Sequence, residues 1–296
     1  MTRLHDDEAA LGGIAGGSTG AMVEESMHRE QPRSHTLAKT LLPPLVLGIV
    51  LIGFWYFISY VILDPARRFL LRPPHEVLTV GFLDWDNFSE ILEKTWVTTQ
   101  ISLKGLAIAI LIGSSLATAM SQSKYIERAL FPYMVTLQAI PILAIVPLIG
   151  FWFGFGDTSR LTVVVLIALF PIIVNTLFGL QSTERGLHDL LTLHGASRST
   201  RLRKLMFPGA LPAIFAGLRI SAGLSVIGAI VGDFFFAQGQ TGLGQLLRRF
   251  AVRLDGEQLI AAIIMSSALG VSVFWIFGII QQRAIGRWYD TGGEAT

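Results

Sequence analysis

The sequence predicts an all-α integral membrane protein with about six transmembrane helices. The mean hydropathy is +0.58, 52% of the 296 residues are hydrophobic and only 15% are charged, which does not describe a soluble domain. Six apolar runs come close to or exceed the roughly 20 residues that a helix needs to cross a bilayer. The basic residues lie at the ends of these runs, so the pI near 9.0 does not indicate a nucleic-acid partner.

The N-terminal segment, residues 1–36, is predicted to be a flexible tail. It is polar, and its glycine-rich run at 12–17 offers little to bury in a folded core. The segment does not fit a secretory signal, because its early charges are acidic and no apolar stretch follows them. Translation could start at Met1, Met22 or Met27.

The six apolar runs are the predicted membrane spans. Arg33 and Lys39 precede the first run as a basic anchor. The third and fourth runs lie so close together that the sequence defines the boundary between them poorly. An even number of spans returns both termini to one side, and a small excess of Lys and Arg favours a cytoplasmic tail. The runs cover approximately residues 41–63, 96–120, 129–155, 161–180, 211–237 and 259–280.

The first membrane helix and an external connection occupy residues 37–95. In this connection Pro73 and Pro74 favour an extended backbone. Residues 84–96 are acidic and amphipathic, a pattern that predicts a helix lying at the membrane surface. A plain solvated helix that leads into the next span fits the same pattern equally well.

A polar segment between the fourth and fifth runs organises the chain. A short amphipathic helix is predicted to end at Gly195, because glycine is the usual residue just beyond a helix. A second helix begins near Ser197, a good N-cap, and Pro208 closes it by removing a backbone donor. Cationic loops between spans normally stay on the cytoplasmic side. The two helices are therefore predicted to form a rigid cytoplasmic projection, a knob, to which a soluble partner could bind. The second helix carries Arg198, Arg201, Arg203 and Lys204.

This segment resembles the EAA loop of ABC importer permeases, which is written EAA-x3-G-x9-I-x-LP. The glycine at 195, the proline at 208 and their spacing match, whereas the first three residues differ from Glu-Ala-Ala. The resemblance implies a coupling loop over about 185–209 that docks into a groove of an ATPase subunit. An ordinary basic loop between two helices is the alternative. The residues that the resemblance assigns to the coupling loop are Asp189, Leu190, Leu191, Gly195, Ala196, Ser197, Leu205 and Pro208.

Further matches follow in order along the chain. Residues 71–78 are similar to the "LPPPSEVL" segment of the nitrate, sulfonate and taurine branch of these permeases, and 239–244 resembles the family's external "GLG" turn. The resemblance covers almost all of 71–287 and implies the type I ABC importer permease fold. It makes 96–287 the transmembrane permease core and 288–296 a cytoplasmic C-terminal tail.

Prolines and amides inside the third and fourth runs are candidates for the translocation route. Pro141, Pro147 and Pro171 each free a backbone carbonyl, which hydrocarbon tolerates only where neighbours or water satisfy it. Gln138 and Asn175 add side-chain amides to this apolar setting. They either line the route or make helix–helix hydrogen bonds.

Three ionisable residues lie within or near the runs. Lys104 and Arg219 are close enough to helix ends to extend toward the interface. Asp233 lies deeper, where a carboxylate is costly and therefore a functional candidate. It occupies a place where related permeases often carry Glu, so it is expected to serve a gate or an inter-helix hydrogen bond. The candidate pathway residues are thus Gln138, Pro141, Asn175 and Asp233.

The sequence offers no catalytic residues and no metal site. It contains no cysteine, which excludes disulfides, zinc–thiolate sites and thiol catalysis. The glycines at 239–244 do not form a phosphate loop, because no Lys-Ser/Thr follows them, and no G-x4-G-K-[ST] occurs elsewhere. His188 and His194 flank the coupling loop without a nucleophile or a metal-ligand cluster around them.

The resemblance implies a permease subunit in a bacterial cell membrane, crossing it several times with both termini cytoplasmic. Expected partners are an ATP-binding cassette ATPase subunit, an extracytoplasmic solute-binding protein, a second copy of the chain, a small-molecule solute and membrane lipid. No cofactor is expected in this chain, because ATP and Mg would be bound by the partner ATPase.

The solute class stays open at the level of sequence. Permeases of the resembled branch serve sulfonate-, nitrate- or taurine-like anions, or aromatic heterocycles such as pyrimidine precursors and flavins. Phenylalanines at 151–155 and 234–236 would suit a planar solute, or would pack in the core or against lipid. The alternative functions are an ion-coupled secondary transporter or channel acting without an ATPase, and an integral membrane enzyme.

Overall fold

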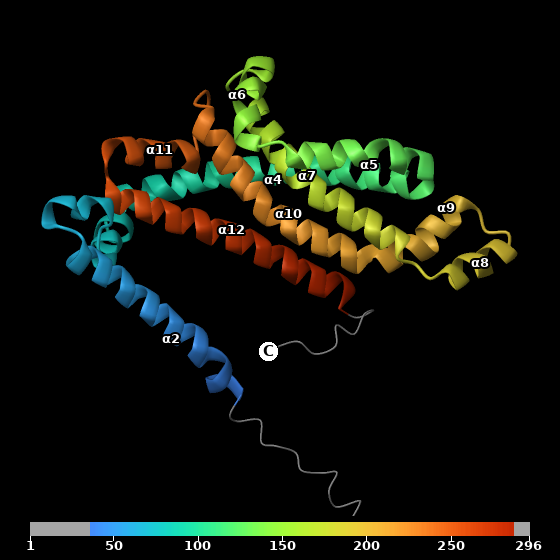
Figure 1. The fold of residues 1–296 in the computed structure, drawn as a ribbon, viewed down its shortest axis with the longest axis horizontal. Helices are drawn as coiled ribbons and strands as arrows, with labels where there is room; N and C mark the ends of the chain where they lie inside the picture. The colour runs from blue at the N-terminus through green and yellow to red at the C-terminus, as the bar shows by residue number, and fades with distance from the viewer. Residues whose placement is uncertain (1–35, 287–296) are drawn as a thin grey trace, which may run out of the picture. The chain divides into compact units, whose positions relative to one another are not determined.

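The computed structural model describes residues 36–286, with side chains from Leu42 onward, and this part of the chain contains helices and no strand (Figure 1). By its internal contacts the whole chain divides into two units, Met1–Leu51 and Ile52–Thr296. The predicted tails, the basic anchor side chains and the possible later start codons lie outside the described residues.

The described part of the chain begins with a membrane helix and an irregular helical connection. These elements are α2 (Thr36–Phe57), η2 (Ile58–Ile62), η3 (Pro65–Leu70), α3 (Pro74–Glu76) and η4 (Val77–Leu83). The remaining elements are α4 (Trp85–Gln122), α5 (Lys124–Ala139), α6 (Ile142–Phe153), α7 (Asp157–Gln181), α8 (Arg185–Leu193), α9 (Arg198–Arg201), η5 (Leu202–Met206), α10 (Phe207–Phe235), α11 (Leu243–Arg253) and α12 (Gly256–Ile285).

Among the described residues, five helices are long and apolar enough to cross a membrane. A sixth span arises if α5 and α6 are counted together. These two helices meet at an angle of 102°, so the predicted span over 129–155 is a broken one. The break lies at Pro141, whose backbone is extended and whose ring nitrogen cannot donate the next helical hydrogen bond. The five spans are Leu42–Ile62, Trp85–Gln122, Asp157–Gln181, Arg198–Phe235 and Gly256–Ile285.

The acidic segment before the second span belongs to that span. Residues 84–96 do not form a separate helix at the membrane surface, because α4 runs without interruption from Trp85. Asp84 caps this helix, and its carboxylate accepts a hydrogen bond of 3.1 Å from the Asp86 backbone nitrogen. Only the first of the two neighbouring prolines is extended, since Pro74 starts α3.

The core of the second unit is built on α7, which packs against both α10 and α4 (Figure 1). Small residues allow the backbones of α7 and α10 to approach closely. A side chain at Gly228 would place its Cβ 2.9 Å from the Val164 Cα. The Ser221 hydroxyl on α10 donates a hydrogen bond of 2.7 Å to the Ala168 carbonyl on α7. The two helices therefore form one tightly packed pair.

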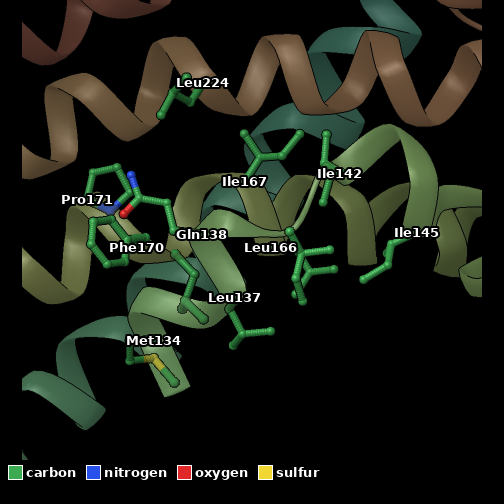
Figure 2. A pocket seen from close by; sticks show the side chains of 12 residues that line it. Met134, Leu137, Gln138, Ile142, Ile145, Leu166, Ile167, Phe170, Pro171 and Leu224 are labelled. Carbon is green, nitrogen blue, oxygen red and sulfur yellow. The ribbon is translucent and has the colours of Figure 1, made fainter. Parts of the chain in front are cut away.

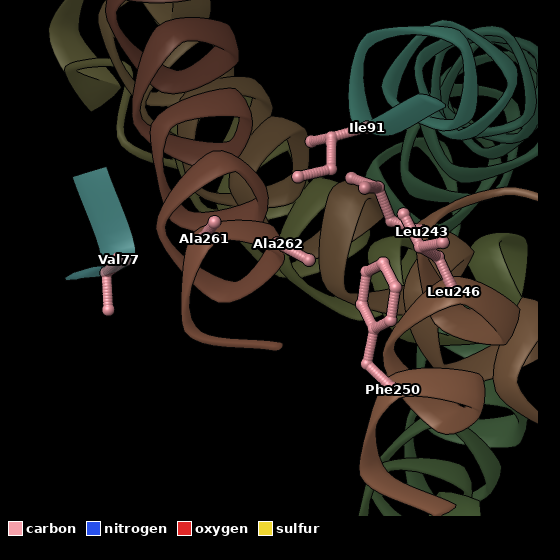
Figure 3. Close-up of a cluster of buried hydrophobic side chains, with 7 residues drawn as sticks. All are labelled: Val77, Ile91, Leu243, Leu246, Phe250, Ala261 and Ala262. Carbon is pink, nitrogen blue, oxygen red and sulfur yellow. The ribbon is translucent and has the colours of Figure 1, made fainter. Parts of the chain in front are cut away.

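A second apolar cluster joins the irregular connection to the end of the bundle that contains α11. It contains residues from η4, α4, α11 and α12, and Figure 3 shows its side chains. An ion pair between Arg249 of α11 and Glu90 of α4 reinforces it, and the hydrogen bond to Glu90 raises the pKa of the Arg249 guanidinium. The buried members of the cluster are Val77, Ile91, Leu243, Leu246, Phe250, Ala261 and Ala262.

The expectation that Pro208 closes a helix is also wrong. The chain stays helical from α9 through η5 into α10, a single span of 38 residues, Arg198–Phe235. In η5 the Phe207 nitrogen donates to the Leu202 carbonyl, five residues earlier. This wider turn shifts the hydrogen-bond register directly before the proline, and the helix continues past it.

Candidate functional site

The knob, which we define as residues 185–201, contains α8, α9 and the turn between them. It projects from the N-terminal end of α10, opposite the end that leads to α11 (Figure 1). Three leucines of α8 are exposed although the helix is amphipathic: Leu187 by 43%, Leu190 by 51% and Leu193 by 85%. Exposed leucines at this spacing form an apolar surface that is available to a partner.

A defined hydrogen-bond pattern ends α8 at the predicted glycine. Gly195 has φ +67°, which glycine adopts without the cost that a Cβ brings. Its nitrogen donates to the Thr192 carbonyl at 3.0 Å, and the Ala196 nitrogen donates to the Leu191 carbonyl at 2.9 Å. These two bonds are the Schellman arrangement, which satisfies carbonyls at a helix end.

The second helix of the knob is capped and tied back to the first. The Ser197 hydroxyl accepts a hydrogen bond of 3.2 Å from the Thr200 nitrogen, which confirms the predicted N-cap. The Arg201 guanidinium donates to the Thr192 hydroxyl at 2.9 Å and so links α9 to α8. The turn and this link fix the two helices relative to each other.

The knob is attached firmly to the bundle. Leu202 and Met206 of η5 pack against a core cluster that contains Leu180 of α7 and Ala210 of α10. Leu205 and Pro208 are half-buried, whereas Asp189 is exposed. A cavity of about 180 Å³ separates the knob from the end of α4, and its lining residues are Ser121, Gln122, His188, Arg198, Arg201 and Met206.

A second cavity, of about 250 Å³, lies where α5 and α6 meet (Figure 2). The predicted pathway residue Gln138 and the helix-interior Pro171 both line it. Pro141 lies at the break itself, between two lining residues, and is not part of the lining. We call this space the bend cavity, and its lining residues are Met134, Leu137, Gln138, Ile140, Ile142, Ile145, Leu166, Ile167, Leu169, Phe170, Pro171 and Leu224.

Asn175 does not line the bend cavity. Its side-chain nitrogen donates a hydrogen bond of 2.8 Å to the Pro171 carbonyl on the same helix. It also lies under Gly217 of α10, where an added Cβ would approach the Asn175 Cβ to 2.7 Å. The structure therefore places this amide in the contact between α7 and α10.

Asp233 is buried, with backbone donors around its carboxylate. Gly242 donates to both oxygens at 3.0 Å, and Gln245 donates at 2.8 Å, so Asp233 caps the start of α11. The Arg160 guanidinium lies 3.5 Å away. Of the two expected roles, this geometry matches the inter-helix hydrogen bond.

Sequence analysis did not identify Arg160 as a candidate site residue. Its side chain is fully buried and donates to the carbonyls of Phe236, Gln238 and Gln240. It thus holds the loop between α10 and α11 against the start of α7. A signal was present in the sequence. Arg160 stands at the start of one apolar run and Asp233 near the end of another, so the two charges could lie at the same depth in the membrane and pair.

Arg219 has an aromatic partner on α12. Its guanidinium carbon lies 4.0 Å from the centre of the Phe274 ring. Lys104 of α4 is exposed. Among residues 36–286, no group of three or more His, Asp or Glu side chains could hold a metal ion.

Comparison with known proteins links these features to transport. The family model "Binding-protein-dependent transport system inner membrane component" matches residues 109–286, which include the knob and the bend cavity. The formylaminopyrimidine transport permease protein ThiX of Halalkalibacterium halodurans is 34% identical over 79% of this chain and 90% of the relative. The riboflavin transport system permease protein RibX of Chloroflexus aurantiacus is 32% identical over 88% and 96%. The taurine transport system permease protein TauC of Escherichia coli is 28% identical over 81% and 86%.

Proposed function

Because this chain belongs to the family of binding-protein-dependent transport system inner membrane components, we propose that its knob is the docking element for an ATPase subunit. The chain is a multi-pass ABC importer permease, a transport subunit and not an enzyme. The observation that carries the docking proposal is the rigid, exposed α8–α9 pair at the end of the longest membrane helices.

In the proposed mechanism the α8–α9 pair transmits the motion of the ATPase to the membrane helices. Two copies of the chain form the pathway, and each presents its knob to one ATPase subunit on the cytoplasmic side, where both termini also lie. The ATPase binds ATP and Mg²⁺, and closure of the ATPase pair draws the knobs together. An external binding protein delivers the solute while ATP stabilises one of two packings of the bundle. The surrounding membrane is a bacterial cell membrane.

The relatives' solutes support two solute classes for this chain. Two relatives above 30% identity are named for heterocycles, formylaminopyrimidine and riboflavin, and a third, 31% identical, is named for no solute. More distant relatives are named for taurine and aliphatic sulfonates, which carry an acidic group. The function proposed at this level is import of one small solute from either class.

A charge placed on the knob tests the docking proposal. Leu193→Glu introduces a carboxylate at an 85% exposed position, so it should not disturb folding. Co-expressed ATPase subunit should then co-purify about tenfold less, because a charge would enter an apolar contact. Val252→Glu on α11 is the matched control, since its 78% exposed side chain lies at the other end of the bundle.

The outcomes separate the rival functions. Loss of the ATPase with Leu193→Glu and its retention with Val252→Glu support docking through the knob. Undiminished co-purification of both variants would exclude the knob as the contact. Solute uptake that persists after the ATPase is omitted from proteoliposomes would instead favour an ion-coupled transporter or channel.

A further inference from the structure

The bend cavity has the chemistry of a site for a neutral ring. Eleven of its twelve lining residues are apolar, and none carries a charge. Its volume of about 250 Å³ lies just below the range found for small-molecule pockets, about 300–1,000 Å³. The space is therefore suited to one small ring system.

Polar groups in the lining offer mainly hydrogen-bond acceptors. Pro141 and Pro171 have no N–H, so the carbonyls four residues earlier, of Leu137 and Ile167, lose their helical donors. Both carbonyls belong to lining residues. The Gln138 side-chain amide makes no hydrogen bond with the described part of the chain. It can accept one and donate another.

We propose that the bend cavity is a transient binding site for a neutral, planar nitrogen heterocycle that carries N–H donors. This inference rests on the proposed function and selects between its two solute classes. The ring faces contact the apolar side chains, the N–H groups meet the free carbonyls, and the Gln138 amide pairs with the ring edge. An anion is excluded, because no cation lines the cavity and unpaired carbonyl oxygens repel negative charge.

The natural absence of cysteine permits a direct test. Leu166→Cys places a thiol in the lining and leaves the Gln138 side chain unchanged. The complete importer carrying this variant is treated with 2-hydroxyethyl methanethiosulfonate, which is neutral, or with the anionic 2-sulfonatoethyl reagent. The labelling rate of each reagent is divided by its rate of reaction with the free thiol N-acetylcysteine methylamide, which corrects for the intrinsic reactivity of the reagent. Only a thiolate reacts, so labelling also reports water in the cavity.

The neutral reagent should react at least about tenfold faster than the sulfonate after this normalisation, because the cavity disfavours the anion. Millimolar 4-aminopyrimidine or lumichrome should slow the labelling, whereas methanesulfonate should not. Gln138→Leu in the same background should abolish this protection. Leu111→Cys is the control outside the bend cavity. We expect this 70% exposed position within the span Trp85–Gln122 to face lipid, so it should react with neither reagent.

Three results would overturn the inference: equal rates for the two reagents, no labelling of Leu166→Cys, or no protection by either heterocycle. The proposed function is judged separately in the same preparation, by whether the ATPase subunit co-purifies. Retained ATPase with an overturned labelling pattern would reject the site alone. Loss of the ATPase from the unmodified cysteine-free chain would reject the proposed function.

Discussion

At the scale of single residues, the stability of the fold should be most sensitive to the charges of the buried Arg160–Asp233 pair. Both side chains are buried, and each also makes hydrogen bonds with backbone groups of the loop between α10 and α11. Removing one partner of such a pair leaves an uncompensated buried charge. Asp233→Asn should therefore lower the stability of the purified chain by about 3–5 kcal/mol, seen as a lower midpoint of thermal unfolding in detergent.

Asp157 provides the control for this prediction, because its carboxylate also lies near Arg160, at 3.3 Å, but is 61% exposed. Asp157→Asn should lower the free energy of unfolding by less than about 1 kcal/mol, because an exposed ion pair contributes little to stability. Equal midpoints for the Asp157 and Asp233 variants would contradict the assigned role. Arg160→Met combined with Asp233→Asn should recover part of the loss, since neither charge then remains unpaired.

The two glycines of the knob should respond to alanine in opposite directions. Gly195 has open space around it but φ +67°, so Gly195→Ala should destabilise the turn by about 1–2 kcal/mol through strain alone. Gly186 lies inside α8, also in open space, and Gly186→Ala should stabilise that helix by up to about 1 kcal/mol. Amide hydrogen exchange over residues 185–201 would measure both effects; faster exchange in both variants would refute the difference.

These single residues also show what local sequence can specify. Gly195 and Ser197 were predictable because their hydrogen bonds join residues within five positions of each other. The pairing of Arg160 with Asp233 was not, because it depends on which helix ends meet in space. The same holds for Asn175, whose surroundings are set by a glycine on another helix.

At the scale of elements, the contact between α7 and α10 depends on close backbone approach. Gly228→Ala would push a Cβ against the Val164 backbone, which cannot move aside as a side-chain tip can. We expect a loss of about 1–3 kcal/mol in the thermal stability of the detergent-solubilised chain.

Gly223 is the matched control on the same helix, with nothing within 4 Å of an added Cβ. Gly223→Ala should leave stability unchanged or raise it by up to about 1 kcal/mol, because alanine favours the helix. A comparable loss in both variants would mean that helix flexibility, and not packing, requires the glycines.

The six spans could be anticipated from apolar length and the prolines indicated broken helices, but the place and angle of the bend between α5 and α6 could not be predicted. Proline is present inside α5, α6, α7 and α10 without ending them, whereas Pro141 marks the one sharp break found between apolar helices of the described residues. Whether a proline ends a helix depends on the tertiary contacts that satisfy the freed carbonyls, and these contacts are absent from a local pattern. Pro208 was misjudged for this reason.

At the scale of the whole described bundle, one helix connects the three sites. The span Arg198–Phe235 starts in the knob, contributes Leu224 to the bend cavity and ends with the Asp233 cap. Its 38 residues extend over about 57 Å at 1.5 Å per residue. If the knob is the proposed docking element, we expect its displacement to be passed along this helix toward the cavity and the loop held by Arg160.

This continuity predicts that a loose knob will bind the ATPase but transmit motion poorly. Arg201→Ala removes the hydrogen bond to Thr192 that ties α9 to α8, while the exposed leucines of α8 stay in place. In proteoliposomes containing the full importer, ATPase co-purification should persist, and solute uptake per ATP hydrolysed should fall several-fold. Arg203→Ala is the control, because it removes the same charge from the following turn at an exposed position. If both variants keep the uptake per ATP of the unmodified importer, the link between α8 and α9 is not needed to transmit motion. If both variants lower it equally, the positive charge of the knob matters and its rigidity does not.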